Sequence, residues 1–281
     1  MRVGEIFRSH WPVLVGYLLL ALPTLYALAT EAWSLEIGTH GPIVLATGVW
    51  LLARAARSLP LRTPGRPAVT AIFLSIALPI YIFGRAYDFL SLEAAALWMV
   101  TIGGTWSLFG RDIRALAFPL LYLGFLVPPP GWLVDQLTAP LQQFVSYVAS
   151  EVLLFAGYPI IRSGVTIFVA QYQLLVEQAC SGMNSLIGLT AISLFYIYIL
   201  YGSSWRYSLI LTGFILPIAV ITNIVRVIAL ILITYHFGDA AAQGFLHGTT
   251  GVIVFSFVLF LFVVFDAALR KILPRSRWTP Q

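Results

Sequence analysis

The chain has 281 residues, of which 60% are hydrophobic and only 10% are charged. Soluble domains carry about 25% charged and about 45–50% apolar residues, so this composition excludes an ordinary cytosolic or secreted globular protein and indicates a membrane protein. The formal net charge of +5 comes from 16 Lys plus Arg against 11 Asp plus Glu. No basic stripe interleaved with aromatic residues accompanies it, so we assign the charge to basic loops and expect no nucleic-acid partner.

Eight apolar segments are candidates to cross a bilayer, whose hydrocarbon core of about 30 Å needs about 20 residues of helix. They are 12–30, 40–54, 68–84, 94–110, 115–130, 183–201, 207–225 and 248–268. Ala27-Leu28-Ala29 resembles a signal-peptidase site, but further spans follow and we interpret residues 1–29 as a retained span. We predict an all-α polytopic membrane protein with about eight transmembrane helices, forming one integral membrane domain over 1–281.

Basic residues gather in alternate loops, which sets the orientation. They precede the first span, join spans 2 and 3, 4 and 5, and 6 and 7, and follow span 8: Arg2, Arg8, Arg54, Arg57, Arg62, Arg66, Arg111, Arg114, Arg206, Arg270, Lys271, Arg275 and Arg277. The intervening loops 31–39 and 85–93 are mainly acidic. Because cytoplasmic loops carry the excess of Lys and Arg, we predict that both termini are cytoplasmic.

The segment 131–182 is then on the outer side, and it is the least membrane-like part of the chain. It follows Pro128-Pro129-Pro130, a helix stop. Residues 134–155 place apolar side chains at helical spacing with polar ones between them, which predicts an amphipathic helix in or near the outer interface. β-Branched and aromatic runs over 160–176, separated by Ser163-Gly164, predict a small β-hairpin or meander.

Few residues are available for chemistry. The chain has one cysteine and four histidines, and no HExxH pair. A lone cysteine excludes an internal disulfide and any multi-cysteine zinc or iron–sulfur site, so we expect no cofactor and no metal.

Cys180 lies in Glu177-Gln178-Ala179-Cys180-Ser181-Gly182, just before the sixth span, which begins on the predicted outer side. The N–H groups and the macrodipole at a helix start favour an anion, and a cysteine there can have a depressed pKa. Because the thiolate is the nucleophile, Cys180 is a candidate nucleophile. The alternative is a small core residue without a reaction.

Arg226 is placed about 28 Å along the seventh span from Tyr207, at its predicted outer end. Its neighbours are apolar, and an arginine within a span is costly and by default a functional candidate. The alternative is an arginine that snorkels to the outer headgroups. Asn223 lies on the same helical face and could orient Arg226 or contact a substrate.

His247 precedes the eighth span, which also begins on the outer side. A histidine at a helix start is biased toward the neutral imidazole, which can accept the proton of a thiol as a general base. His10 is predicted to be cytoplasmic and His40 lies at the distant start of span 2, whereas His236 is also on the outer side and remains the main rival. Nucleophile, base and cation are the groups that cysteine acyl transfer requires.

These residues together resemble the exosortase/archaeosortase family of integral-membrane cysteine transpeptidases. The resemblance covers about 115–265 and includes the Pro-rich stretch at 128–131, Ala139-Pro140-Leu141-Gln142, Ile161-Arg162-Ser163-Gly164, the Cys180 motif, Asn223-Ile224-Val225-Arg226 and His247. It implies that Cys180 is the nucleophile and that Arg226 and His247 complete its triad. Asn223, Glu177, Asn184 and Ser181 are the substrate-binding or supporting residues that we expect. Glu177 could orient His247 or only face solvent, and Arg226 could stabilise the oxyanion or bind an acidic residue of the substrate.

The resemblance also implies the partners. The substrates would be exported proteins tethered to the bacterial inner membrane by a C-terminal sorting signal, which combines a short motif such as Pro-Glu-Pro, a transmembrane helix and a basic tail (PEP-CTERM). The new carboxyl end would pass to an acceptor nucleophile of unknown identity. The chain ends soon after span 8, so we expect no appended extracytoplasmic domain. Two other classes stay open: a non-enzymatic transporter or assembly scaffold, and a His247-dependent membrane acyltransferase.

Overall fold

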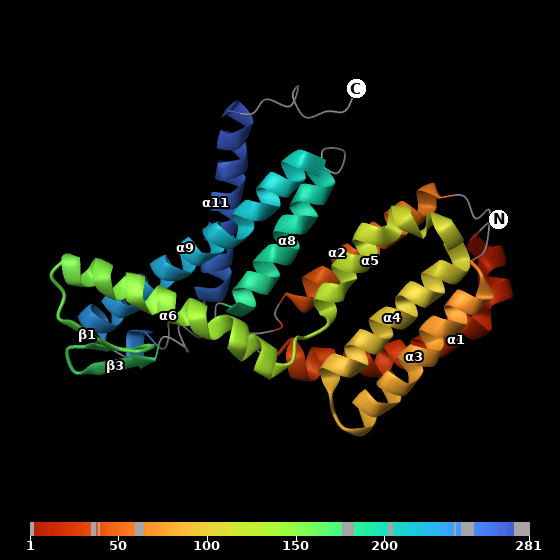
Figure 1. The fold of residues 1–281 in the computed structure, drawn as a ribbon, viewed down its shortest axis with the longest axis horizontal. Coiled ribbons are helices and arrows are strands. Elements are labelled where there is room, and N and C mark those ends of the chain that lie inside the picture. Colours follow the sequence, from red (N-terminus) through yellow and green to blue (C-terminus); the bar gives the residue numbers. More distant parts are fainter. Residues whose placement is uncertain are drawn as a thin grey trace. The chain divides into compact units, whose positions relative to one another are not determined.

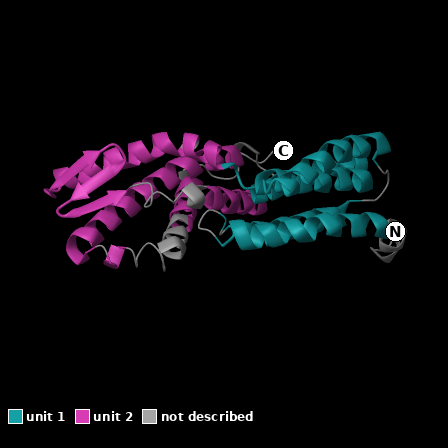
Figure 2. Ribbon diagram, turned by 90° about the horizontal axis from the view of Figure 1, so that it is seen from below, with its two compact units in different colours: residues 1–130 teal, residues 131–281 magenta. Residues whose placement is uncertain are grey.

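The computed structural model describes residues 3–34, 38, 40–59, 65–175, 183–201, 205–238, 240–242 and 250–272. These residues are mainly helical and divide into two compact units, Met1–Pro130 and Gly131–Gln281, which Figure 2 colours separately. The break falls directly after Pro128-Pro129-Pro130, the predicted helix stop. The organisation as one membrane domain stays a prediction.

Unit 1 consists of helices. They are α1 (Val3–Ala27), a π-helical turn η1 (Leu28–Ala32), α2 (Gly41–Ser58), α3 (Pro67–Ala86), α4 (Leu90–Phe109), the 3₁₀ turn η3 (Gly110–Leu116), α5 (Ala117–Leu123) and the 3₁₀ turn η4 (Gly124–Leu126). The helices α3 and α4 form a hairpin, α1 packs on α4, and α2 packs on α5 (Figure 1). Pro67 at the first turn of α3 suits a helix start, where its missing N–H has no intrahelical partner.

The predicted span 115–130 is not one α-helix, and this prediction was wrong in its local structure. Only the seven residues of α5 are α-helical, between the 3₁₀ turns η3 and η4. Gly110, at φ +52°, ends α4, and the three prolines at 128–130 cannot donate to a continuing helix. The chain therefore crosses this region in short segments.

Unit 2 contains helices and a small sheet. Its elements are α6 (Gly131–Phe155), β1 (Ile160–Ser163), β2 (Thr166–Val169), β3 (Tyr172–Leu175), α8 (Met183–Tyr201), α9 (Trp205–Phe237) and α11 (Thr250–Ile272). The strands form an antiparallel meander in the order β1-β2-β3, with Ile160 opposite Val169 and Val169 opposite Tyr172. Gly164 and Ala170 have positive φ angles at the two turns. The predicted helix over 134–155 and the predicted β-meander are thus confirmed as elements, while their position on the outer side stays a prediction.

Helix α9 belongs to two separate cores. The first, which we call the α6–sheet core, joins α6, the sheet and the last part of α9, with Val145, Ile167, Val169, Leu230 and Ile231 among its buried residues. The second, the bundle core, joins α8, α9 and α11. Its buried residues are Ile197, Tyr201, Tyr207, Leu211, Ile215 and Phe262. One continuous helix therefore links the bundle to the α6–sheet layer (Figure 1).

The predicted end of the seventh span at residue 225 was wrong, because α9 continues to Phe237. The apolar residues after Arg226 contact α6 and the sheet, and this tertiary packing extends the helix. The helix ends before Gly238, whose φ of +85° lies in the left-handed region that favours glycine. Arg226 therefore lies within the helix and not at its end.

Four helical stretches in the described part of the chain are long and apolar enough to cross a membrane. They are Trp11–Ala32, Pro67–Ala86, Leu90–Leu126 and Tyr207–Phe237, with a shorter apolar helix over Ile187–Tyr201. The chain is a membrane protein by this measure. The predicted number of eight spans is not confirmed by these residues.

Candidate active site

Arg226 and Asn223 are buried on one face of α9, where the helix passes from the bundle core to the α6–sheet core. Each residue is only 6% exposed. Asn223 lies three residues before Arg226, which places both on the same side of the helix. Thr222, also buried, donates its hydroxyl to the Ile218 carbonyl at 2.9 Å. Protein covers this arginine, whereas a snorkelling arginine would present its guanidinium to headgroups and water.

Cys180, Glu177, Ser181 and His247 lie outside the described residues. Asn184 belongs to the first turn of α8, and its side chain is likewise outside the description. The triad of Cys180, Arg226 and His247 therefore stays a prediction. The structure does describe the three helices next to which these residues stand in the chain.

The helices α8, α9 and α11 pack on one another in unit 2 (Figure 1). Asp266 of α11 contacts Tyr201 of α8 and Tyr207 of α9, which marks one common end of this bundle. From these contacts, α8 extends 18 residues back to Met183 and α11 extends 16 residues back to Thr250. At 1.5 Å per residue these lengths are about 27 Å and about 24 Å.

Arg226 lies 19 residues beyond Tyr207 on α9, which is about 28 Å. Measured along the helices, the starts of α8 and α11 are therefore at nearly the same distance from the Asp266 contacts as Arg226. Cys180 and His247 each precede the first residue of their helix by three positions in the sequence. Three residues span at most about 10 Å of chain, which is the greatest length that separates each of them from the start of its helix.

The contacts of Asp266 form a cluster that sequence reasoning missed. Its carboxylate is fully buried and accepts a hydrogen bond from each of three tyrosine hydroxyls. Tyr196 donates to Oδ2 at 2.8 Å, Tyr201 lies 2.9 Å from Oδ1 and 2.8 Å from Oδ2, and Tyr207 donates to Oδ1 at 2.8 Å. Arg270 completes the set with an ion pair of 2.9 Å to Oδ2. We call these five residues the Asp266 cluster.

A sequence signal for Asp266 existed. It is an acidic residue inside the predicted span 248–268, and Arg270 follows it at the i,i+4 spacing of a helical ion pair. Ionisable residues inside spans are functional candidates by default. The three tyrosines could not be anticipated, because their convergence depends on how α8 and α9 pack.

The other histidines are placed as follows. His40 directly precedes α2 in unit 1, and the side chain of His10 is outside the description. His236 is exposed in the last turn of α9, with its Nε2 3.4 Å from the Tyr158 hydroxyl. It lies ten residues beyond Arg226, which is about 15 Å along the helix.

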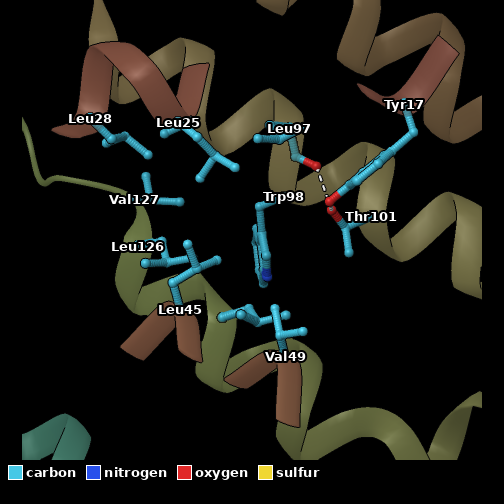
Figure 3. A pocket seen from close by; sticks show the side chains of 12 residues that line it. Tyr17, Leu25, Leu28, Leu45, Val49, Leu97, Trp98, Thr101, Leu126 and Val127 are labelled. Atoms are coloured by element: carbon cyan, nitrogen blue, oxygen red, sulfur yellow. Dashed lines mark hydrogen bonds between the residues drawn. The ribbon is translucent and has the colours of Figure 1, made fainter. Parts of the chain in front are cut away.

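Figure 3 shows a mainly apolar pocket in unit 1, whose lining contains no Asp, Glu, Lys, Arg, His or Cys side chain. Its lining residues are Tyr17, Leu25, Leu28, Leu45, Val49, Ala94, Leu97, Trp98, Thr101, Leu123, Leu126 and Val127. The Tyr17 hydroxyl lies 3.0 Å from Thr101 Oγ1, and the Trp98 indole donates to the Leu120 carbonyl at 2.6 Å. Within the described chain, no three His, Cys, Asp or Glu side chains are grouped so as to hold a metal ion.

Comparison with known families gives one result. A family model described as transmembrane exosortase matches residues 32–264. The match includes Cys180, Arg226 and His247, and it extends well before residue 115, where the resemblance in the sequence began. No curated protein and no solved structure matched the chain.

Proposed function

The chain belongs to the transmembrane exosortase family, and on that premise we propose that it cleaves a membrane-tethered protein with Cys180 as its nucleophile. Membership makes it a membrane cysteine transpeptidase in general, which acts on a membrane-associated protein substrate. Cleavage at a C-terminal sorting signal, with Arg226 and His247 as the partners of Cys180, is the specific form that we propose.

One observation carries this proposal. The helices that follow Cys180 and His247 in the chain begin about 27 Å and about 24 Å from the Asp266 contacts, and Arg226 lies about 28 Å from them. These helix lengths support a site in which three residues far apart in sequence meet at one level of one bundle. The burial of Arg226 and Asn223 supports a role inside the protein and opposes the snorkelling alternative.

The proposed reaction uses these groups in a fixed order. The Cys180 sulfur attacks the carbonyl carbon of the scissile peptide bond, and His247 accepts the thiol proton. Arg226 stabilises the oxyanion of the tetrahedral intermediate. When the C–N bond breaks, His247 returns the proton to the leaving amine, and a thioester remains on Cys180. An acceptor nucleophile or water then attacks the thioester and restores the thiol.

The remaining residues have supporting roles in this proposal. Asn223 orients Arg226 or contacts the substrate from the same face of α9, while Glu177 orients His247. Ser181 and Asn184 follow the nucleophile in sequence, and we propose that they contact the substrate or support the site. The position of His236, ten residues beyond Arg226, supports His247 as the base.

The bilayer contributes to the reaction that we propose. With both termini in the cytoplasm, Cys180 acts on the outer face of the bacterial inner membrane, where a PEP-CTERM-like signal presents its scissile bond. Helix α9 is long enough to cross the bilayer, because its candidate span of 31 residues is about 46 Å long and exceeds the hydrocarbon thickness of about 30 Å. A substrate held by one membrane helix gains effective concentration at the site.

The decisive experiment is co-expression with a candidate PEP-CTERM substrate, followed by its intact mass. We expect cleavage by the parent protein and none by Cys180→Ala inserted in the membrane at an equal amount. Cleavage by Cys180→Ala would overturn Cys180 as the nucleophile, and absence of cleavage by the parent protein would favour the acyltransferase or scaffold classes. His247→Ala should also be inactive, whereas an inactive His236→Ala beside an active His247→Ala would reassign the base.

The orientation has a separate test, which uses Cys180 as the sole thiol. A membrane-impermeant maleimide added to intact cells should label the protein, and Cys180→Ala is the control for background. Labelling only in inverted vesicles would overturn the proposed orientation and the outer site with it.

A further inference from the structure

The Asp266 cluster connects all three helices of the bundle through one buried carboxylate. Asp266 and Arg270 belong to α11, Tyr196 and Tyr201 to α8, and Tyr207 to α9. Oδ1 accepts from Tyr207 and Tyr201, while Oδ2 accepts from Tyr196, Tyr201 and Arg270, all within 2.8–2.9 Å. Among the contacts described, Tyr207 is the single hydroxyl that α9 contributes, whereas α8 contributes two.

The occupancy of this carboxylate argues against a ligand or a proton relay at Asp266. The two oxygens together hold four donors, three tyrosine hydroxyls and Arg270, and the residue has no exposed surface. A carboxylate accepts about four hydrogen bonds, so little capacity remains for a substrate group. The cluster therefore acts through the helices that it joins.

We propose that Asp266 is a positioning residue of the catalytic site. It fixes α8, α9 and α11 to one another at one end of the bundle and thereby sets the spacing of Cys180, Arg226 and His247 at the other. This inference rests on the proposed function, since it takes these three residues as the site. It deepens that function by assigning a residue about 25 Å away from the reacting atoms.

The length of the helices makes the positioning effect large. A helix that tilts by about 5° about the cluster displaces a point about 27 Å away by about 2 Å. A misplacement of about 1 Å in a catalytic constellation can lower the rate about 10²-fold. A small loosening of the cluster is thus amplified at the site, even where the helices remain folded and packed.

The principal test compares Asp266→Asn with Glu93→Gln, its matched control. Glu93 is likewise a buried carboxylate that joins three helices, but in unit 1 (Thr24 of α1, Arg85 of α3 and α4 itself). At equal amounts of folded protein, we expect Asp266→Asn to lower kcat about 10²-fold with little change in KM. Glu93→Gln should leave both within about twofold.

Two tyrosine variants with different expected losses test the geometry. If Asp266→Asn does not fold, these two variants are sufficient to test the positioning role. Tyr207→Phe removes the hydroxyl from α9, while Tyr196→Phe removes one of two from α8. We expect Tyr207→Phe to lower kcat about tenfold and Tyr196→Phe by less than about threefold. Equal losses, or losses that parallel the amount of unfolded protein, would overturn the inference and leave a purely structural cluster.

The sole thiol gives a readout that does not depend on turnover. The pH dependence of Cys180 alkylation reports the apparent pKa of its thiol. If Arg226 and His247 are its neighbours, as we propose, this pKa should lie below the ordinary value of about 8.5. We expect Tyr207→Phe and Asp266→Asn to move the midpoint toward about 8.5, with Glu93→Gln matching the parent protein. An unmoved midpoint together with unchanged kcat refutes positioning.

Failure of this inference is distinguishable from failure of the proposed function. If Cys180→Ala still cleaves, the proposed function fails whatever Asp266 does. If Cys180→Ala is inactive while both cluster variants keep the parent's kcat and alkylation midpoint, the proposed function stands and Asp266 has no positioning role.

Discussion

The two units each contain a buried carboxylate that joins three helices, and the two carboxylates differ in how completely they are paired. Glu93 of unit 1 accepts from the Thr24 hydroxyl at 2.8 Å and pairs with Arg85 at 3.3 Å. Asp266 of unit 2 has three tyrosine donors and a shorter ion pair of 2.9 Å. Both arginines are about half exposed, 51% for Arg85 and 45% for Arg270.

The difference between the two carboxylates fits the different task of each bundle within the bilayer. Lipid tails are as apolar as leucine, so packing and polar contacts, not hydrophobic burial, hold helices together in a bilayer. In unit 1 several separate polar contacts join α1 to the α3–α4 hairpin, namely Thr24 to Glu93, Tyr17 to Thr101 and Tyr81 to the Leu20 carbonyl. Unit 2 also supports an α6–sheet core and, in our proposal, the reacting groups. Its denser cluster fits a bundle whose far end must be accurately placed.

The largest expected effect is the loss of kcat in Arg226→Lys of unit 2, which we compare with Arg85→Lys of unit 1. Lys keeps the charge of Arg226 but loses the planar fork of donors. If Arg226 stabilises the oxyanion, Arg226→Lys should lower kcat about 10²–10³-fold, or about 2.7–4 kcal/mol, with little change in KM. Arg85→Lys should leave turnover unchanged, since Lys keeps the charge opposite Glu93 and unit 1 supplies no group to the proposed reaction.

Steady-state kinetics on a tethered substrate separates the outcomes for Arg226→Lys. A raised KM, masked when the acidic residue of the substrate is replaced, would mean that Arg226 binds a ground-state carboxylate. Unchanged kcat and KM would remove Arg226 from the reaction and reduce the site to a Cys180–His247 dyad.

A core substitution in each unit tests the role of solvent. Ile167 is fully buried in the α6–sheet core, which we predict to lie outside the hydrocarbon, and Leu120 is buried in unit 1. Ile167→Ala should lower the free energy of unfolding by about 3 kcal/mol, from the lost transfer energy plus the cavity. Leu120→Ala should cost less, because transfer to lipid contributes little and mainly the cavity remains. Equal losses in detergent titrations would place both cores in the same solvent.

The fold was predictable where local chemistry decides it. The polar residues at helical spacing in 134–155 and the Ser163-Gly164 turn are local signals, and α6 and the meander follow from them. The extension of α9 beyond 225 depends on contacts with Leu174 and Val145, which belong to other elements. The prediction that Arg226 lies at the membrane interface placed the end of the helix at residue 225, which is too early. The choice of Arg226 as a candidate site residue did not depend on that boundary.

The site was predictable to a smaller extent. The motif around Cys180 and the family resemblance select the residues, and the family match now covers 32–264. What sequence could not provide is the means of aligning three helices. That alignment depends on Tyr196, Tyr201 and Tyr207 meeting Asp266, and no spacing within a single helix encodes it.

Neutralising the unit 1 carboxylate is expected to have a smaller effect. Gln at position 93 retains a carbonyl oxygen that accepts from Thr24, and it loses the ion pair with the half-exposed Arg85. We expect Glu93→Gln to lower the free energy of unfolding by about 1 kcal/mol. Asp266→Asn should cost more, since three hydroxyls depend on its two oxygens. Thermal unfolding of both variants in the same detergent compares them, and the reverse order would contradict the ranking of the two carboxylates.

The smallest effect is expected at the unit 1 pocket, where a tyrosine donates to a neutral partner. Thr101 already donates its one proton to the Leu97 carbonyl at 2.9 Å, so Tyr17 is the donor of the 3.0 Å bond between their hydroxyls (Figure 3). Tyr17→Phe removes that bond but leaves the Thr101 proton satisfied, and a helix-to-helix hydrogen bond in a bilayer contributes about 0.6 kcal/mol on average. Tyr207→Phe instead takes a donor from a buried carboxylate, so its loss of stability should exceed that of Tyr17→Phe. If calorimetry in matched detergent finds the two phenylalanine variants equally stable, the charge of Asp266 does not strengthen its cluster, and the contrast between the two units disappears.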